Sequence, residues 1–250
     1  NNGLKFDSSP SFFNVTFTGN SAEWGVGVFN DGVNGKSSPS FVNVSFQGNL
    51  GLSSGGAVYN DSSNPENVDA VSSPSFSNVV FSGNLAAWGG AMYNDGQPSG
   101  DASPSLVNVT FSGNRATAQG GAIYSMGSDD GTASPSLTNV ILWQNRATEG
   151  ASIFNHDAEV FIGHSVVENG RESIVNQGNS WITWDSLTNV DGDPLFVESV
   201  DPSTAPTFGG DLRLQSGSAA IAAGDNFALS PAITTDLDGK DRIDDGTIEI

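Results

Sequence analysis

Three carboxylates around a glycine turn have the best spacing for metal chemistry in this chain. Asp236, Asp238 and Asp241 occupy alternate or nearly alternate positions around Gly239. Ca²⁺ prefers about six to eight oxygen ligands, and such a turn can supply several of them. The twelfth position counted from Asp236 is Thr247, so the Glu of an EF-hand loop is missing. Calcium is therefore the one cofactor that the residues suggest, and a solvated acidic turn is the alternative.

Catalytic residues are not indicated by the sequence. His156 and His164 lie near Asp157 and Glu159, where a metal or acid–base site is one interpretation and a structural role the other. Glycoside hydrolysis requires two carboxylates that face one cleft, and no such pair follows from the spacing. No Ser–His–Asp arrangement follows from it either. We expect a protein without catalytic residues.

Several asparagines could carry glycans. Asn60 begins a polar loop and is followed by Asp and Ser, which makes it the candidate for an exposed glycosylation site. Three further asparagines begin the same Asn-x-Ser/Thr glycosylation sequence. They share a repeated position with Asn78 and Asn139, which are not followed by such a sequence. These three, for which a structural amide is the favoured interpretation, are Asn14, Asn43 and Asn108.

A repeated phrase explains why these residue types recur. Ser-Pro-Ser-[Phe/Leu]-x-Asn-Val-x-[Phe/Leu]-x-x-Asn occurs five times, followed by a glycine pair and an aromatic residue. Its prolines are spaced by 29, 35, 30 and 31 residues, at Pro10, Pro39, Pro74, Pro104 and Pro135. One repeat of this length cannot bury its own apolar face, so neighbouring repeats must stack.

Each repeat predicts short strands rather than helices. In residues 75–81, Phe76, Asn78 and Val80 alternate with the intervening residues, and this period of two is typical of a strand. The glycines and asparagines between such runs predict turns. No segment shows a sustained helical period. The loops of variable length all follow the aromatic position of the repeat, so we expect them on one flank of the solenoid, with only short turns on the other.

Equivalent positions of the repeats form columns, which predict the fold class. We expect an all-β protein, a right-handed parallel β-helix with about five regular coils and degenerate C-terminal coils. Neighbouring coils would then lie about 4.8 Å apart, with aromatic rings stacked in the core and asparagine amides hydrogen-bonded along the stack. The columns are Asn14, Asn43, Asn78, Asn108 and Asn139; Phe17, Phe46, Phe81, Phe111 and Leu142; and Phe29, Tyr59, Tyr93, Tyr124 and Phe154.

The repeat decays along the chain. We assign residues 1–157 to the regular coils and residues 158–250 to degenerate C-terminal coils or a cap of the same solenoid. Residues 193–197 and 211–214 resemble further strands without the repeated phrase. Atypical terminal coils are expected, because the open end of a solenoid exposes apolar core and unpaired strand edges.

The composition excludes several classes of partner. The chain has 28 acidic and 8 basic residues, for a net charge of -20. Nucleic acids and anionic membrane surfaces both require basic residues, so neither is an expected partner. No apolar run reaches the roughly 20 residues that span a bilayer, so we expect no membrane insertion by this segment. Cysteine is absent, so disulfides are too. This composition fits an extracellular or cell-surface protein.

The repeated turn motifs resemble the polymorphic outer-membrane-protein repeat of bacterial surface proteins. The resemblance rests on FQGN with GGAVYN, FSGN with GGAMYN, and FSGN with GGAIYS. The later phrases DPLFV, DLRLQSGSAAIAAGD and DLDGKDRIDDG are similar to the closing coils of large secreted right-handed β-helix proteins, although Ala220 and Ala223 replace the usual Pro and Asp. The resemblance implies a surface adhesin, an autotransporter passenger or a structural exoprotein, mostly without known enzymatic activity.

Three functional hypotheses follow. The first is a non-enzymatic extracellular structural or adhesive β-solenoid. Its open ends, at residues 1–7 and 247–250, could pair head-to-tail with further copies and form filaments. The second is a carbohydrate-active β-helix enzyme, either a polysaccharide lyase or a glycosidase. The third is a glycan-binding module that uses Trp24 and Trp88, which occupy equivalent positions of their repeats. The expected partners are the chain itself and surface glycans.

Overall fold

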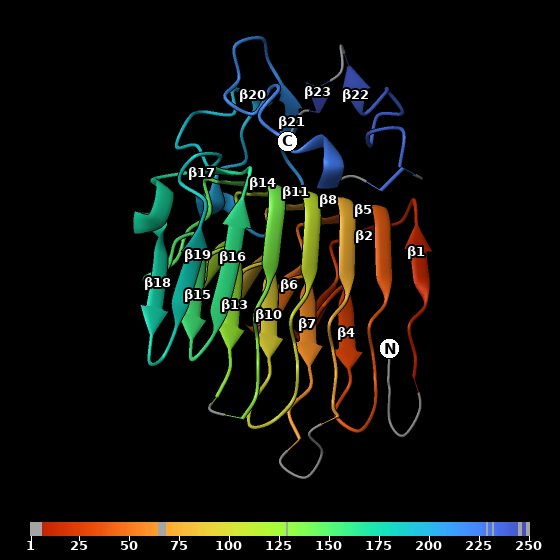
Figure 1. The fold of residues 1–250 in the computed structure, drawn as a ribbon, viewed down its shortest axis with the longest axis vertical. Helices are drawn as coiled ribbons and strands as arrows, with labels where there is room; N and C mark the ends of the chain where they lie inside the picture. The colour runs from red at the N-terminus through yellow and green to blue at the C-terminus, as the bar shows by residue number, and fades with distance from the viewer. Residues whose placement is uncertain are drawn as a thin grey trace.

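The repeats stack as a right-handed parallel β-helix, which confirms the all-β solenoid that the sequence predicts. The computed structural model describes residues 7–64, 69–128, 130–228, 230–231, 233–244 and 247–248. Each of the first four coils contributes to all three parallel sheets, the fifth contributes a strand to two of them, and strands of successive coils lie side by side (Figure 1). Repeats one coil apart are in register, so that Phe46, Phe81 and Phe111 are neighbours across the sheet.

The longest sheet, called sheet 1, is formed by the repeated phrase itself. Its regular strands have eight residues and begin at the serine after the proline. Its members are β1 (Ser11–Phe13), β2 (Thr16–Thr18), β5 (Ser40–Gln47), β8 (Ser75–Ser82), β11 (Ser105–Ser112), β14 (Ser136–Trp143), β16 (Glu159–Gly163), β17 (Val166–Val167) and β19 (Trp181–Trp184).

Two smaller sheets complete each coil. Sheet 2 follows the Gly-Asn turn and contains β3 (Ser21–Trp24), β6 (Leu50–Ser54), β9 (Leu85–Trp88) and β12 (Arg115–Gln119). Sheet 3 follows the glycine pair and contains β4 (Val28–Asp31), β7 (Val58–Asp61), β10 (Met92–Asp95), β13 (Ile123–Met126), β15 (Ile153–His156) and β18 (Ile174–Gln177). The variable loops leave the C-terminal ends of the sheet 3 strands.

Each glycine of the pair between sheets 2 and 3 is required for a different reason, the first for its backbone conformation and the second for close packing of neighbouring coils. The first glycine has a positive φ, such as 60° at Gly89, which side chains rarely tolerate. The second lies against the next coil, so that a Cβ at Gly90 would come within 2.2 Å of the Gly121 carbonyl oxygen. The pair therefore sets both the direction of the chain and the close approach of neighbouring coils.

The strict alternation expected within residues 75–81 is wrong. Phe76, Val79 and Phe81 all point into the main core, and Asn78 between them has a left-handed φ of 54°. Such a residue bends the strand and shifts the side-chain alternation by one position. All five asparagines of this column share that conformation, with φ between 54° and 56°, so they point away from the core.

Stacked rings fill the core as ladders. Phe81 stacks on Phe46 and Phe111 with centroid separations of 4.8 and 4.7 Å and interplanar angles of 3° and 4°. Tyr59, Tyr93 and Tyr124 also stack at 4.9 Å, but they form a separate cluster on the face of sheet 3 that points away from the main core. Pleating explains the difference, because successive side chains of a strand point to opposite faces.

A second asparagine column provides the buried polar ladder. Asn84 is fully buried, and its Nδ2 donates to Asn114 Oδ1 at 2.8 Å and to the Phe46 carbonyl at 3.0 Å. Its Oδ1 accepts from the Asn49 backbone N–H at 3.0 Å and from Asn49 Nδ2 at 2.9 Å. These asparagines close the turn between sheets 1 and 2, where backbone groups would otherwise lack partners.

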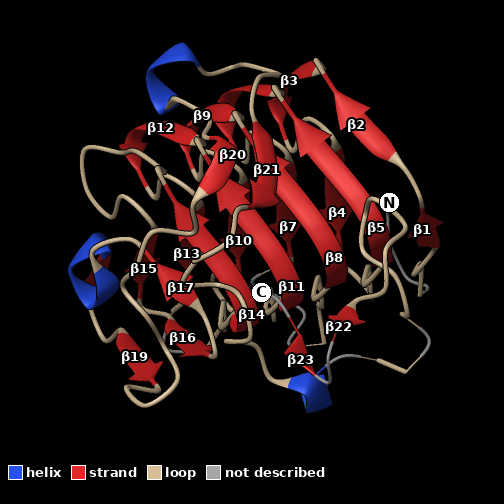
Figure 2. Cartoon of the chain, turned by 90° about the horizontal axis from the view of Figure 1, so that it is seen from above, coloured by secondary structure: helices blue, strands red, loops and turns tan. Residues whose placement is uncertain are grey.

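The C-terminal part does not continue the solenoid to its end. Coils persist through β18 and β19, and then residues 191–242, here called the C-terminal arm, turn back over the outer side of sheet 1 (Figure 2). The two expected strands exist as β20 (Phe196–Glu198) and β21 (Asp211–Leu214), but they pair antiparallel with each other. Beyond the arm, β22 (Ile243–Asp244) and β23 (Thr247–Ile248) pair in the same manner. The short 3₁₀ helices are η1 (Gly170–Ser173), η2 (Pro202–Thr204) and η3 (Asn226–Ala228).

Candidate functional site

A groove of about 1450 Å³ lies between the outer side of sheet 1 and the C-terminal arm. Residues 209–214 and 235–242 of the arm form its walls. The hairpins β20–β21 and β22–β23 both lie above the long strands β5, β8, β11 and β14 (Figure 1). The floor residues are Phe13, Asn14, Thr16, Asn43, Ser45, Gln47, Asn78, Val79, Val80, Ser82, Asn108, Thr110 and Ile141.

Four of the five left-handed asparagines, those of the first four coils, lie in this floor. Asn14 is exposed and Asn43 half-buried, whereas Asn78, Asn108 and Asn139 have exposed fractions of 3%, 4% and 0%. The groove is therefore open over the first coils and closed over the fifth. Their amides also form a ladder, with Asn78 Nδ2 3.1 Å from Asn43 Oδ1 and Asn139 Nδ2 2.8 Å from Asn108 Oδ1.

Asparagine side chains also attach the arm to sheet 1. Asn78 Nδ2 donates to the Thr235 carbonyl at 2.8 Å. Asn139 Nδ2 donates to the Asp225 carbonyl at 3.0 Å, and its Oδ1 accepts from the Asp225 backbone N–H at 2.7 Å. These amides satisfy backbone groups of the arm that would otherwise be buried without partners.

The other edge of the arm packs on the repeated glycine of Phe-x-Gly-Asn. The Thr207 backbone N–H donates to the Gly83 carbonyl at 3.0 Å, and a Cβ at Gly83 would meet the Thr207 carbonyl at 2.3 Å. Val200 lies equally close to Gly113. An apolar cluster that contains Ile141 and Phe196 joins the arm to the last regular coil. The arm is thus a packed cover and forms a defined wall of the groove.

The groove wall carries charges of both signs. Arg213 forms an ion pair with Asp211, and its hydrogen bonds lower the pKa of Asp211 to about 2. This carboxyl therefore stays ionised at neutral pH. In total three basic and four acidic residues line the groove, which are Arg213, Lys240, Arg242, Asp211, Asp236, Asp238 and Asp241.

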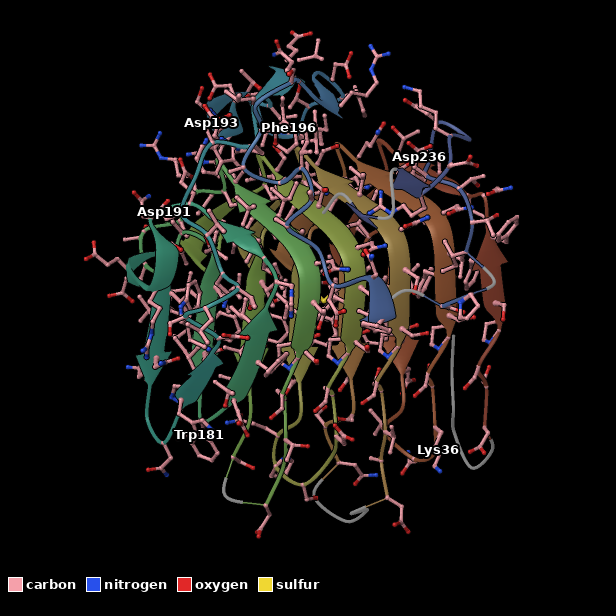
Figure 3. The ribbon with its side chains drawn as sticks, turned by 45° about the horizontal axis from the view of Figure 1, so that its top comes forward. Lys36, Trp181, Asp191, Asp193, Phe196 and Asp236 are labelled. Atoms are coloured by element: carbon pink, nitrogen blue, oxygen red, sulfur yellow. The ribbon has the colours of Figure 1, made fainter. Side chains whose placement is uncertain are left out.

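The predicted calcium ligands lie in the groove wall, but their carboxylates do not converge. Asp236 Oδ1 accepts from the backbone N–H groups of Asp238 and Lys240 at 2.9 and 2.8 Å, so it closes its own turn. Within the described ranges, no group of three His, Asp or Glu residues could hold a metal ion. Asp191 and Asp193, a second pair of carboxylates around a glycine, lie at the opposite end of the arm from Asp236 (Figure 3).

Asn60 is not an exposed glycosylation site, which corrects the sequence-based expectation. Its exposed fraction is 0%. Its Nδ2 donates to Asn94 Oδ1 at 2.8 Å, and its Oδ1 accepts from Asn30 Nδ2 at 2.7 Å. The side chain before the loop still belongs to β7 and points inward, because it is two positions from the buried Val58.

The two histidines are not brought together into one site. His156 Nδ1 lies 3.4 Å from an Asp157 carboxylate oxygen at the end of β15. The His164 backbone has a φ of 51° and its N–H donates to Thr188 Oγ1 at 2.9 Å, so it forms a turn after β16. His156 Nδ1 is buried and has no hydrogen-bond partner among the described residues.

Trp24 and Trp88 lie on the outer face of sheet 2, away from the groove. Their exposed fractions are 49% and 40%. Ser54, on the strand between them, is the register partner of both tryptophans across the sheet. They are thus two coils apart, roughly 10 Å along the axis. Leu52, also strongly exposed, lies on the strand between them. This face forms an aromatic platform, defined here as Trp24, Leu52 and Trp88.

Groove residues such as Ser45, Thr110 and Arg213 were missed at the sequence level. Ser45 and Thr110 share a register position with Thr16 and Val80, and this column of small polar residues on the outer side of sheet 1 was the available signal. Arg213 had no signal, because only the fold brings the arm to the sheet.

Comparison with known families detects the repeat itself. The Chlamydia polymorphic membrane protein repeat matches residues 43–61 and 108–126, which form the second half of β5 through β7 and the corresponding part of β11 through β13. No curated protein and no solved structure matches the chain. In the part that the structure describes, no helix has the length and apolarity needed to cross a membrane. The chain is thus a parallel β-helix that carries repeats of the Chlamydia polymorphic membrane protein type.

Proposed function

We propose that this chain is a non-enzymatic, extracellular β-helix that is displayed at a cell surface and has an adhesive role. The polymorphic-membrane-protein repeats support the surface location. The groove on sheet 1 carries the adhesive role, because polar side chains from four successive coils line its floor. A solenoid suits this task, since repetition builds a long binding surface from one small unit.

The charges of the groove support binding over catalysis. A glycosidase needs one protonated carboxyl whose pKa is raised beside a second, ionised one. In the groove, the hydrogen bonds and charge of Arg213 instead lower the pKa of Asp211, which keeps this carboxyl ionised. Asp236 is held in its own turn by two backbone hydrogen bonds. Neither carboxylate is therefore arranged as a general acid.

Binding of the purified, fluorescently labelled chain to intact cells tests the proposal. Ser45→Trp should fill the open part of the groove and lower cell binding at least about tenfold, a change of roughly 1.4 kcal/mol. Leu187→Ala, at a fully exposed position outside the groove, is the matched control and should bind like the parent. Unchanged binding by Ser45→Trp at an unchanged melting temperature would overturn the adhesive role of the groove.

Two assays separate the rival functions. Release of reducing ends or unsaturated products from polysaccharides by the parent chain would support the enzyme. The double variant Trp24→Ala/Trp88→Ala tests the aromatic platform. If it loses cell binding while Ser45→Trp keeps it, the platform and not the groove is the binding surface. That platform is a second candidate because aromatic faces that are exposed in register can stack on sugar rings.

End-to-end assembly stays a prediction. Residues 1–6, 249 and 250 lie outside the described residues, and β23 pairs with β22 rather than with the last coil. Size-exclusion chromatography with negative-stain microscopy tests it. Linear particles would support self-assembly, and a monomer at every concentration would exclude it for this chain alone.

A further inference from the structure

We propose that the groove on sheet 1 binds a neutral, hydroxyl-rich polysaccharide chain that runs along the solenoid axis across the first four coils. This inference rests on the proposed adhesive function and names its ligand class. It is carried by the period of the polar groups on the floor, by their free hydrogen-bonding capacity and by the balance of charge around them.

Polar groups repeat along the floor with the period of the coils. Thr16, Ser45, Val80 and Thr110 occupy one register position of sheet 1. Neighbouring strands lie about 4.8 Å apart, so a linear ligand along the axis would meet the hydroxyls of Thr16, Ser45 and Thr110, with the apolar Val80 between the last two. Thr16 Oγ1 and Ser45 Oγ lie 3.1 Å apart, so the hydroxyls of the first two coils are in direct contact.

The open half of the floor has unused hydrogen-bonding groups. Asn43 Oδ1 accepts from Asn78, but Asn43 Nδ2 has no partner among the described residues. The same holds there for the amide of Asn14 and the hydroxyl of Thr110. Amides and hydroxyls both donate and accept, as sugar hydroxyls do, so they can recognise a chain of alternating donors and acceptors.

The charge balance excludes a polyanion as the preferred ligand. The groove wall has four carboxylates and three basic groups, and the whole chain has a net charge of -20. Arg213, the most direct candidate for an acidic sugar, is already paired with Asp211. Uronate polymers and nucleic acids would therefore be repelled rather than concentrated.

The sheet geometry disfavours an extended peptide as the occupant. Strands β5, β8 and β11 each pair on both sides, so over these three coils the floor presents side chains and no free strand edge. Peptides that add a strand to a sheet rely on such an edge. Recognition on this floor must use side-chain amides and hydroxyls.

Titration calorimetry with defined oligosaccharides tests the inference. The probes are cello-, laminari-, manno- and chito-oligosaccharides, with oligogalacturonate as the acidic comparison. Asn43→Gly combined with Thr110→Val removes two floor groups. The fold should tolerate both changes, because glycine accepts the left-handed backbone, Asn78 Nδ2 keeps its bond to the Thr235 carbonyl, and Val80 already occupies the Thr110 position. Trp24→Ala with Trp88→Ala is the matched control on the other face.

We expect at least one neutral oligosaccharide to bind, and Asn43→Gly/Thr110→Val to raise its Kd at least about tenfold. The platform variant should bind like the parent. The inference falls if no neutral probe binds, if oligogalacturonate binds better, or if only the platform variant loses binding. If Ser45→Trp still abolishes cell binding while no sugar binds the parent, the adhesive groove stands and only its ligand class is wrong.

Discussion

Replacement of Asn84 by alanine tests the buried asparagine ladder directly. The Asn84 side chain takes part in four hydrogen bonds, two as donor and two as acceptor, and it is fully buried. Alanine removes all four at once. Its smaller side chain cannot restore any of them, so the partners on the neighbouring coils must find others or stay unsatisfied.

The expected cost follows from those partners. At about 1 kcal/mol for each net hydrogen bond, the four bonds contribute about 4 kcal/mol. Two partners keep another bond, since Asn49 Nδ2 also donates to the Phe17 carbonyl and Asn114 Oδ1 also accepts from the Asn84 backbone N–H. The Asn49 backbone N–H loses its side-chain acceptor. We therefore expect a loss of about 3–4 kcal/mol, a large share of a typical stability.

Thermal unfolding followed by circular dichroism measures this loss. For a chain of this size, 3–4 kcal/mol corresponds to a fall in Tm of roughly 6–16 °C. Asn14→Gly is the control, because that amide is exposed, has no partner among the described residues and sits at a φ of 55° that glycine accepts. A loss below about 1 kcal/mol for Asn84→Ala would refute the view that this ladder stabilises the turns.

Three further predictions address the core, the outer face of sheet 3 and the metal hypothesis. Phe81→Asp should lower the free energy of unfolding by at least about 4 kcal/mol, because it buries a charge inside a ring stack. Phe81→Leu should lower it by less than about 1.5 kcal/mol, because Leu142 occupies the same column. Equal denaturation midpoints for the two variants would contradict the register. Burial raises the pKa of Asp95, so its ionisation costs stability above the folded-state pKa and the parent gains stability as pH falls through it. Asp95→Asn should therefore raise Tm at pH 7, with a difference that shrinks in acid, and a lower Tm at neutral pH would contradict this reasoning. Millimolar calcium should leave Tm unchanged, because the Asp236 carboxylate already closes its own turn, and a rise that Asp238→Ala abolishes would instead establish a calcium site.

The regular coils were predictable because stacking repeats one environment. Equivalent residues such as Phe46, Phe81 and Phe111 meet the same neighbours in every coil, so their column in the sequence is also a column in space. The strand alternation around Asn78 was not predictable in the same way. Its left-handed backbone shifts Val79 and Phe81 inward, and asparagine in a strand pattern gives no unambiguous signal for that bend.

The candidate site needed contacts between distant parts of the chain. Asn78 and Thr235, or Asn139 and Asp225, meet only because the arm turns back over sheet 1. The turn-back is driven by apolar burial around Ile141 and Phe196. The prediction of an exposed glycosylation site at Asn60 was wrong for a related reason. Its sequence context is typical of a loop start, but the residue is the buried third position of β7.

The sequence by itself determined the solenoid, its coil length, its ring ladders and its acidic, cysteine-free surface, because all of these depend on periodicity and composition. Tertiary structure alone decided which face of the solenoid is covered, where the groove opens and which charges line it. The physical reason is that stacking between repeats is local and periodic. The packing of a non-repeating arm such as residues 191–242 depends instead on one set of long-range contacts that no period encodes.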